Sequence, residues 1–430
     1  MIPVATRKGQ TIALFGLGGS GVVTAKALIA GGAKLVAYDD NPQSVIAAAE
    51  DGIPVGDLRN FDFSKADALV LAPGVPLTHP KPHWTVELAK DRNVEIVGDV
   101  SLFADELRSS QFDNWFIATT GTNGKSTTTA LISHILSNGS RDVQMGGNIG
   151  RAVLSLEPCF DGRHYVVECS SYQIDLAPVL DPTIGILLNL APDHLDRHGT
   201  MENYAGIKER LVSGSTHSIV GSDDTASVKI GERLKESGRN VYSISNQKPV
   251  DNGVFAQGGE LVSTLNGPEQ VVADLSGIAT LRGMHNAQNA CAAYLACHLS
   301  GLSDGQIQEG LISFPGLAHR MEIIGNIGTT VFVNDSKGTN ADAASMALSS
   351  FDNIHWIAGG LAKEGGIDSL RPLFGRIKKA YLIGEAAPEF AVTLGKDVPF
   401  EISGTMNVAV ANASADAAKS ETETSVLLSP

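Results

Sequence analysis

The sequence predicts an α/β protein of several domains, and two observations carry this prediction. Apolar runs typical of strands alternate with helical patterns, an order that produces parallel sheets. A strand, a Gly-rich turn and a helix follow one another at residues 11–30, again at residues 115–132, and once more after Asn326. The length of 430 residues exceeds what one core usually holds, so we expect two to four domains.

The bulk composition excludes some functions. A net charge of −15 argues against general nucleic-acid binding, which needs a basic surface. Any phosphate site must therefore be locally basic or must use Mg²⁺. Residues 1–10 have no apolar signal core and no apolar run reaches the length of a membrane span, so we expect a soluble, cytoplasmic protein without a membrane partner. The scattered cysteines fit buried free thiols better than a zinc site or a disulfide framework: Cys159, Cys169, Cys291 and Cys297.

The first strand is followed by Gly16-Leu17-Gly18-Gly19-Ser20-Gly21, a match to G-x-G-x-x-G. We predict a helix over residues 22–30 and a second strand over residues 34–38. The second strand ends at Asp39, at the spacing used to grip a ribose. Taken alone, this pattern indicates a dinucleotide cofactor, but the same turn suits any pyrophosphate.

Two later apolar runs, residues 68–71 and 94–97, complete this first unit as strands. Gly74 lies in a turn at the carboxyl end of the earlier one, where open α/β sheets bind ligands. The polar stretch 108–114 then marks a domain boundary.

The most informative segment is Thr120-Gly121-Thr122-Asn123-Gly124-Lys125-Ser126-Thr127. It stands between a predicted strand and a predicted helix, the arrangement of a phosphate-binding loop. Backbone N–H groups at such a turn favour an anion, while Lys125 would reach the phosphates and Ser126 would ligate Mg²⁺. The full pattern has Gly where Thr119 stands, so this is a relaxed form of the loop.

Three further positions near this loop are candidates for chemistry. Glu168 ends a predicted strand, where nucleotide hydrolases place a magnesium contact, although a solvated carboxylate is common there too. The run from Asp193 to His198 holds two aspartates and two histidines, which favours a metal or phosphate site with His194 or Asp193 as ligand. Lys208 lies in a helical pattern and, on its pattern alone, is a solvated helix lysine.

The last part of the chain predicts a further α/β domain after a hinge at residues 314–317. Its strands are expected at residues 329–333, 355–357, 379–383 and 425–428. Polar residues follow the hinge or a strand at three places and together suggest a binding surface: Arg320, Asn334 to Asn340, and Gly359 to Lys363.

Together these segments resemble the Mur ligase family, and the resemblance runs in order from Gly16 almost to the end of the chain. The motifs that carry it include Gly121 to Thr127, Gly147-Asn148-Ile149-Gly150, Glu168 to Gln173, Asp193 to His198, and Met284 to Asn289. The segment from Asn334 to Asn340 resembles the branch that adds D-glutamate.

The resemblance implies three domains: a Rossmann-like UDP-binding domain at 1–110, a central P-loop ATPase-type domain at 111–316, and a C-terminal Rossmann-like domain at 317–430. The last would close over ATP, bind the amino acid, and appears cut short, since relatives continue past the final Leu-Ser-Pro. The first Gly-rich turn then serves a uridine diphosphate, with Gly18, Gly19 and Ser20 near the diphosphate. Asp39 and Gly74 would lie near the uridine.

The implied reaction is ATP-dependent amide ligation in peptidoglycan synthesis, through an acyl phosphate, in a monomer that uses two Mg²⁺ ions. Ser126 and Glu168 resemble ligands of one ion, and Glu168 and His194 ligands of the other. Lys208 falls on the family's carboxylated lysine, whose carbamate would hold the second ion. Lys125 completes the implied catalytic set.

The resemblance also assigns the remaining contacts. ATP would be held by Gly121 to Thr127, Asn148, Asn289, Arg320 and Asp335. The UDP substrate would also contact Asn148 and His194, and Lys337, Thr339 and Lys363 would bind the amino acid. Other interpretations stay open: a ligase fold without turnover, an NAD-dependent oxidoreductase based on Gly16 to Gly21, and a folylpolyglutamate synthase-like ligase.

Overall fold

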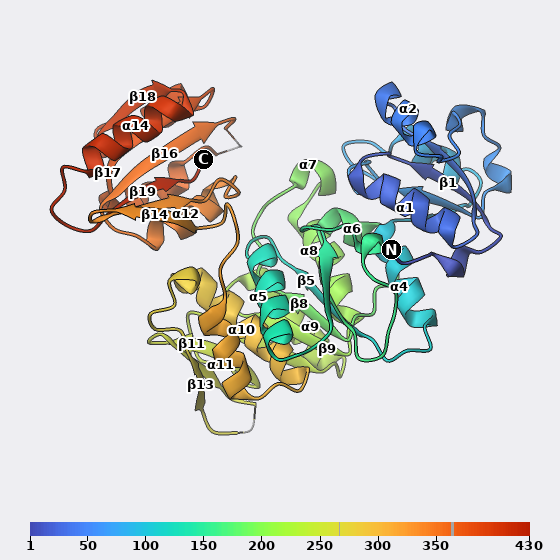
Figure 1. Ribbon diagram of the computed structural model, residues 1–430, viewed down its shortest axis with the longest axis horizontal. Helices are drawn as coiled ribbons and strands as arrows, with labels where there is room; N and C mark the ends of the chain where they lie inside the picture. Colours follow the sequence, from blue (N-terminus) through green and yellow to red (C-terminus); the bar gives the residue numbers. More distant parts are fainter. Residues whose placement is uncertain (266, 363–364) are drawn as a thin grey trace. The chain divides into compact units, whose positions relative to one another are not determined.

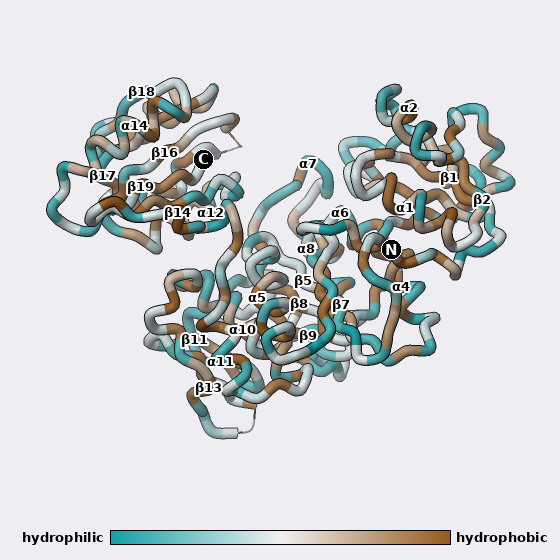
Figure 2. Tube along the Cα trace, in the orientation of Figure 1, coloured by the Kyte–Doolittle hydropathy of each residue, from teal (hydrophilic) through white to brown (hydrophobic). Residues whose placement is uncertain are grey.

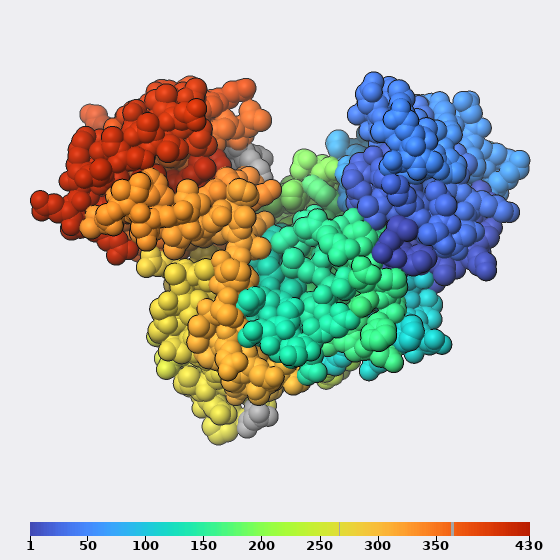
Figure 3. All heavy atoms as spheres, viewed as in Figure 1, coloured from blue at the N-terminus to red at the C-terminus, as the bar shows by residue number. Residues whose placement is uncertain are grey.

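A computed structural model describes residues 1–265, 267–362 and 365–430 (Figure 1). The chain forms two compact units. The first holds Met1–Asp274 and Gln288–Leu311, and the second holds Leu275–Ala287 and Ile312–Pro430. Figure 3 shows the same view with all heavy atoms drawn as spheres.

The first unit begins with a parallel four-stranded sheet in the order β2-β1-β3-β4. Its strands are β1 (Thr11–Phe15), β2 (Lys34–Tyr38), β3 (Ala68–Leu71) and β4 (Glu95–Val97). Strands β1 and β3 are almost wholly buried, as their continuous apolar sequences require in a sheet covered on both faces. The helices are α1 (Gly19–Ala30), α2 (Pro42–Glu50), α3 (Trp84–Lys90) and α4 (Asp99–Ser109).

A nine-stranded sheet follows, in the order β13-β12-β11-β10-β9-β8-β5-β7-β6. Strands β5 to β11 are parallel, and β12 and β13 add an antiparallel edge. The strands are β5 (Trp115–Thr120), β6 (Val143–Gly147), β7 (His164–Glu168), β8 (Ile184–Leu187), β9 (His217–Gly221), β10 (Val241–Ser245), β11 (Gly253–Gln257), β12 (Glu260–Ser263) and β13 (Gln270–Asp274).

In the residues that the structure describes, seven α-helices accompany this sheet along the chain. They are α5 (Lys125–Asn138), α6 (Ser171–Asp175), α7 (Leu195–His198), α8 (Met201–Ser213), α9 (Thr225–Glu236), α10 (Met284–Leu299) and α11 (Asp304–Ser313). Helices α10 and α11 each continue from one unit into the other.

The second unit is built on a six-stranded sheet in the order β14-β15-β19-β16-β17-β18, parallel except for β14. The strands are β14 (Glu322–Ile327), β15 (Thr330–Asn334), β16 (Ile354–Gly360), β17 (Ile377–Gly384), β18 (Phe400–Gly404) and β19 (Thr424–Leu428). Its helices are α12 (Ala341–Ser349), α13 (Ala387–Leu394) and α14 (Met406–Ala417).

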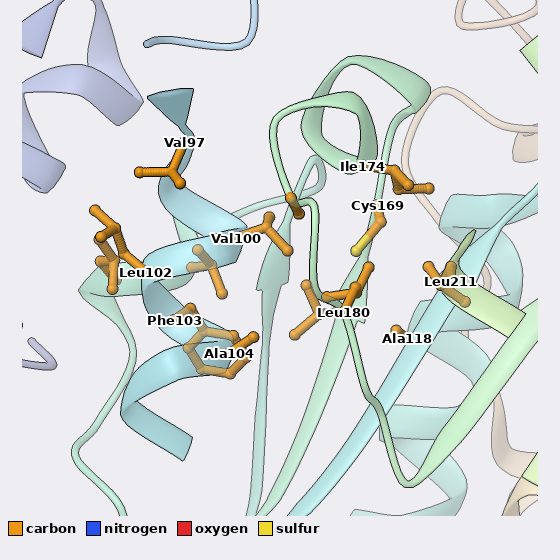
Figure 4. Close-up of a cluster of buried hydrophobic side chains, with 14 of the residues drawn as sticks. Val97, Val100, Leu102, Phe103, Ala104, Ala118, Cys169, Ile174, Leu180 and Leu211 are labelled. Atoms are coloured by element: carbon orange, nitrogen blue, oxygen red, sulfur yellow. The ribbon is translucent and has the colours of Figure 1, made fainter. Parts of the chain in front are cut away.

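One buried cluster joins the two sheets of the first unit (Figure 4). Phe103 of α4 packs edge-on against Phe116 of β5 and Tyr165 of β7, with ring centroids 5.2 and 5.3 Å apart. Figure 2 shows hydrophobic residues along many of the strands, β1 among them. Because this core is shared, residues 1–110 and the nine-stranded sheet belong to a single unit.

The α/β fold class predicted from the alternation of strands and helices is confirmed. The predicted strands do not include β14 and β18, the two edge strands of the second unit. Neither strand has a fully buried position, so neither shows the continuous apolar run on which the prediction of the buried strands rested. Helix α1 begins at Gly19 rather than at residue 22, since glycines carry little helical signal. In the described part of the chain, every helix is too short or too polar to span a membrane.

Candidate active site

The predicted phosphate-binding loop has the expected local structure. Strand β5 ends at Thr120, and α5 begins at Lys125. Gly121 and Gly124 both have positive φ, at 149° and 86°. A Cβ added at Gly124 would lie 2.3 Å from Oδ1 of Asn289, so only glycine fits there. Lys125 folds over the turn, and its Nζ donates to the carbonyls of Gly121 and Thr122 at 3.0 and 2.7 Å.

The side chains of two asparagines make hydrogen bonds to this loop and to the helix that follows it. Asn189, just after β8, accepts from the backbone N–H of Asn123 at 2.9 Å through its side chain. Asn289 of α10 is buried, and its Oδ1 accepts from Thr128 at 3.1 Å. The structure therefore places Asn289, one of the predicted ATP contacts, against α5, the helix that follows the loop. Asn189 was not predicted, because an asparagine after a strand carries no special signal.

Strand order brings the carboxyl ends of four parallel strands together, since β5 lies between β8 and β7, and β6 lies beyond β7. Glu168 ends β7 and is 2% exposed. Its Oε1 accepts from Nδ2 of Asn148 at 2.7 Å, which unites two predicted residues. Its Oε2 is buried without a hydrogen-bond partner among the described residues. An unsatisfied buried carboxylate oxygen is costly, so this atom is suited to a cation.

The sequence pattern around Lys208 predicted a solvated lysine, and the structure shows that this prediction was wrong. Lys208 is 1% exposed, because α8 packs its face onto the sheet. Nζ donates to Oγ1 of Thr120 at 3.1 Å and to the carbonyl of Gly121 at 2.8 Å, beneath the loop. Burial and then the charge of Lys125 lower the pKa of Lys208 well below its usual value, although Asp193, Cys169 and Glu168 act in the opposite direction.

The loop after β8 presents His194 in the left-handed region, at φ 54°. Nδ1 of His194 lies 2.9 Å from the hydroxyl of Tyr172, and Nε2 lies 3.5 Å from a carboxylate oxygen of Asp193. His198 is buried, and burial, followed by the charges of His194 and Lys208, lowers its pKa to about 4. It is therefore neutral at pH 7 and bonds Ser171 at 2.9 Å.

The first Gly-rich turn also has its predicted form. Gly18 is the N-cap of α1, and a Cβ added at Gly18 or Gly19 would meet no atom within 4 Å, so the turn is open to a ligand. Asp39 lies beside it and accepts from the backbone N–H of Leu17 at 2.6 Å. The carbonyl of Gly74 accepts from Arg197 at 3.0 Å, which links this part of the unit to α7.

The second unit carries the remaining predicted residues. Asp335, just after β15, accepts from the N–H of Met321 at 3.1 Å and from the hydroxyl of Ser429 at 3.0 Å. Burial raises the pKa of Asp335. Arg320 lies in the turn before β14, and the backbone N–H of Lys337 donates to the carbonyl of His319. Thr339 borders a small cavity of about 40 Å³ together with Trp356 and Phe390. Lys363 lies outside the described residues.

The predicted magnesium ligands share a chemical pattern that fits the ion. Within the described ranges, no group of three or more His, Cys, Asp or Glu side chains could hold a metal. The predicted set combines Glu168 and His194 with a hydroxyl, Ser126, and with Lys208. The orphaned oxygen of Glu168 fits a hard cation, and a carbamate on Lys208 would add two oxygens of the kind Mg²⁺ prefers.

Known proteins that are similar to this chain belong to one family. The family described as Mur ligase middle domain matches residues 119–297. Two relatives, from Mesorhizobium japonicum and Rhizobium meliloti, are each 61% identical over 431 residues. The alignments cover 100% of this chain and 92% and 93% of the relatives, both named UDP-N-acetylmuramoylalanine--D-glutamate ligase.

The chain therefore belongs to the Mur ligase family. Among solved structures, the fold resembles MurF ligase from Thermotoga maritima in complex with ADP, with a TM-score of 0.58. The match covers 92% of this chain and 90% of that one at 16% identity, so it speaks for the fold alone.

Proposed function

We propose that this protein is an ATP-dependent ligase that joins D-glutamate to the L-alanyl carboxylate of UDP-N-acetylmuramoyl-L-alanine, a step of peptidoglycan synthesis. The relatives that share 61% of its sequence bear the name of that activity. The observation that carries the proposal is the cluster at the carboxyl ends of β5, β7 and β8. A phosphate-binding loop, a buried acid and a buried lysine converge there.

ATP would bind with its phosphates on the turn from Gly121 to Thr127. The N–H groups at the start of α5 attract anions, and Lys125 would swing from the loop carbonyls to the phosphates. Asn148, held by Glu168, would contact the γ-phosphate. Asn289 would hold the nucleotide in the first unit, and Arg320 and Asp335 in the second.

Two Mg²⁺ ions would use Ser126, Glu168, His194 and Lys208. When bound, they would neutralise the charge on the phosphoryl oxygens. A neutral lysine amine adds to CO₂ to form a carbamate with loss of one proton, and the lowered pKa of Lys208 favours the neutral amine that this reaction needs.

The reaction itself would run in two displacements. An oxygen of the L-alanyl carboxylate attacks the γ-phosphorus of ATP, giving an acyl phosphate and ADP. The amine of D-glutamate then attacks the acyl carbon and loses a proton, and inorganic phosphate leaves as the amide forms. Lys125 would stabilise the charge that builds up on the transferred phosphoryl group.

The substrates would divide among three parts of the chain. We assign the UDP portion to residues 1–110, with Gly18, Gly19 and Ser20 at the diphosphate and Asp39 and Gly74 at the uridine. Residues 111–316 would bind ATP, and residues 317–430 would bind D-glutamate through Lys337, Thr339 and Lys363. Since ATP and UDP-linked precursors are cytoplasmic metabolites, we place the reaction in the cytoplasm. We expect the protein to act as a monomer.

The test is phosphate release from ATP and Mg²⁺ in the presence of UDP-N-acetylmuramoyl-L-alanine, with D-glutamate or other amino acids added in turn. We expect release that depends on D-glutamate, with an amide product of matching mass. Release that depends on another amino acid would overturn the assignment of substrate, and a lack of release with every amino acid would overturn the proposed turnover.

A further inference from the structure

Tyr172 makes an unusual number of contacts to one short segment. It is the second residue of α6, four positions after Glu168. Its hydroxyl lies 2.9 Å from Nδ1 of His194, and the two ring centroids are 5.0 Å apart. The ring also packs at 5.4 Å from the ring of His198.

A third residue of the same segment covers the Tyr172 ring. The guanidinium carbon of Arg197 lies 4.6 Å from the ring centroid, a cation–π distance. The same guanidinium donates to the carbonyl of Gly74 at 3.0 Å, so it contacts both the Tyr172 ring and the backbone of Gly74. Arg197 and His198 belong to the short helix α7 and His194 is its N-cap, so three residues of one short segment contact Tyr172.

These contacts join two loops that the backbone does not connect directly. Glu168 is the last residue of β7 and Tyr172 follows that strand, whereas His194 follows β8, with β5 between the two strands. The Tyr172 hydroxyl is therefore a direct side-chain link between the Glu168 loop and the His194 loop. One ring nitrogen of His194, Nδ1, faces this hydroxyl at 2.9 Å, and the other, Nε2, faces a carboxylate oxygen of Asp193 at 3.5 Å. Because the hydroxyl makes the shorter contact, Nε2 is the nitrogen that a bound cation would take over from Asp193.

We propose that Tyr172 is the positioning residue of His194: its hydroxyl holds Nδ1, so that Nε2 serves the phosphoryl-transfer site, and Arg197 keeps the Tyr172 ring in place. This inference rests on the proposed function, because it assigns His194 to the reaction. A hydroxyl that fixes the second nitrogen of a ligating histidine selects its tautomer and ring orientation.

The experiment compares the full chain with Tyr172→Phe, which removes only the hydroxyl. The matched control is Tyr242→Phe, since the hydroxyl of Tyr242 also faces a histidine nitrogen, Nδ1 of His217, at 3.4 Å, away from the site. The Mg²⁺ concentration for half-maximal rate should rise about 10-fold or more in Tyr172→Phe. The KM for D-glutamate should stay within about 2-fold, because Lys337 and Thr339, which are assigned to that substrate, are untouched. Tyr242→Phe should change neither value.

A second readout does not depend on turnover. In ¹⁵N-histidine-labelled protein with Mg²⁺ and ADP, the His194 signals, identified by their loss in His194→Gln, should show a proton on Nδ1. Tyr172→Phe should convert them to a mixture of tautomers, and Tyr242→Phe should not. An unchanged His194 pattern in Tyr172→Phe would overturn the inference.

The two readouts separate this inference from the proposed function. If wild-type protein released no phosphate with any amino acid, the proposed function would fail, and the His194 signals would still decide the role of Tyr172. If Tyr172→Phe did not fold, Arg197→Gln would replace it. That variant removes the charge over the Tyr172 ring and should shift the same signals in the same direction, to a smaller extent.

Discussion

Two lysines, one in each unit, have opposite surroundings. In the first unit, Nζ of Lys208 is bonded to a hydroxyl and a carbonyl, neither of which carries a charge. In the second unit, Lys379 lies 2.8 Å from carboxylate oxygens of both Glu401 and Asp416. As a result, the pKa of Lys208 is lowered by burial, whereas these carboxylates raise the pKa of Lys379.

Two carboxylates, Glu168 in the first unit and Asp416 in the second, differ in a similar way in how fully they are hydrogen-bonded. Glu168 keeps one buried oxygen without a partner among the described residues. Asp416 accepts from Lys379, Lys419 and Tyr381, which hold the pKa of that carboxyl well below its usual range. A network that is satisfied internally stabilises a fold, while buried groups left unsatisfied mark a place where a ligand supplies the missing partner.

The largest expected effect is the loss of activity on replacing Lys208, compared with the replacement of Lys379. Lys208→Ala should lower D-glutamate-dependent phosphate release by about 10³-fold, because the charge arrangement beneath the phosphate loop is lost. A small carboxylate such as acetate should restore part of the rate if the carbamate is the active form. Lys379→Ala is the control: it should keep the rate and lose roughly 1 kcal/mol of stability, as for a partly exposed ion pair. Equal losses of activity in both variants would contradict the assignment of Lys208 to the active site and of Lys379 to a structural ion pair.

The two glutamates give the next effect. Glu168→Gln should lower the rate by about 10²-fold or more and raise the Mg²⁺ concentration needed, since an amide is a poor ligand for a hard cation. Thermal unfolding should show little loss, because the substituted oxygen makes no hydrogen bond in the described structure. Glu401→Gln should do the reverse, keeping the rate and lowering the melting temperature. A Glu168→Gln enzyme with unchanged Mg²⁺ dependence would contradict the assignment.

The pH dependence of stability should have opposite signs in two aspartate variants. Burial raises the pKa of Asp99 from 3.8 to about 6. Its contribution to stability is therefore present below pH 3.8 and is lost as the pH rises through about 6. Asp99→Asn should be more stable than the parent at pH 8, by up to about 3 kcal/mol, and should show no gain at pH 4.

Asp416→Asn provides the opposite case. Because hydrogen bonds from Lys379 lower the pKa of Asp416, that carboxylate contributes stability above its unfolded pKa and loses it at low pH. The variant should therefore be less stable at pH 7, with the deficit shrinking in acid. Urea unfolding of both variants at several pH values measures the two slopes, and slopes of equal sign would refute the comparison.

The smallest effect is expected within the network of the second unit. The hydroxyl of Tyr381 lies 2.8 Å from Nδ1 of His355 and donates to Asp416 at 2.9 Å. Tyr381→Phe should cost about 1–2 kcal/mol of stability, at roughly 1 kcal/mol per hydrogen bond. The rate of phosphate release should not change, and a loss of rate with intact folding would show that this network serves catalysis.

Local patterns were sufficient for part of this protein. The α/β class, the turn at Gly121 to Gly124, and the strand that ends at Glu168 could be predicted because each depends on neighbours in sequence. Apolar runs form buried strands, and a glycine-rich turn before a helix has few alternative conformations. The family and the roles implied for the site residues came from the resemblance of ordered motifs, and those roles remain predictions.

Tertiary structure decided the rest. The pattern around Lys208 predicts a solvated side chain, and only the packing of α8 on the sheet buries it beneath Gly121. The contact of Tyr172 with His194 depends on the strand order β8-β5-β7, which no local pattern contains. The sequence by itself determined which chemical groups are available and which local structures present them. Burial and long-range contacts, which depend on how strands pair in space, decided which of those groups lose water and meet.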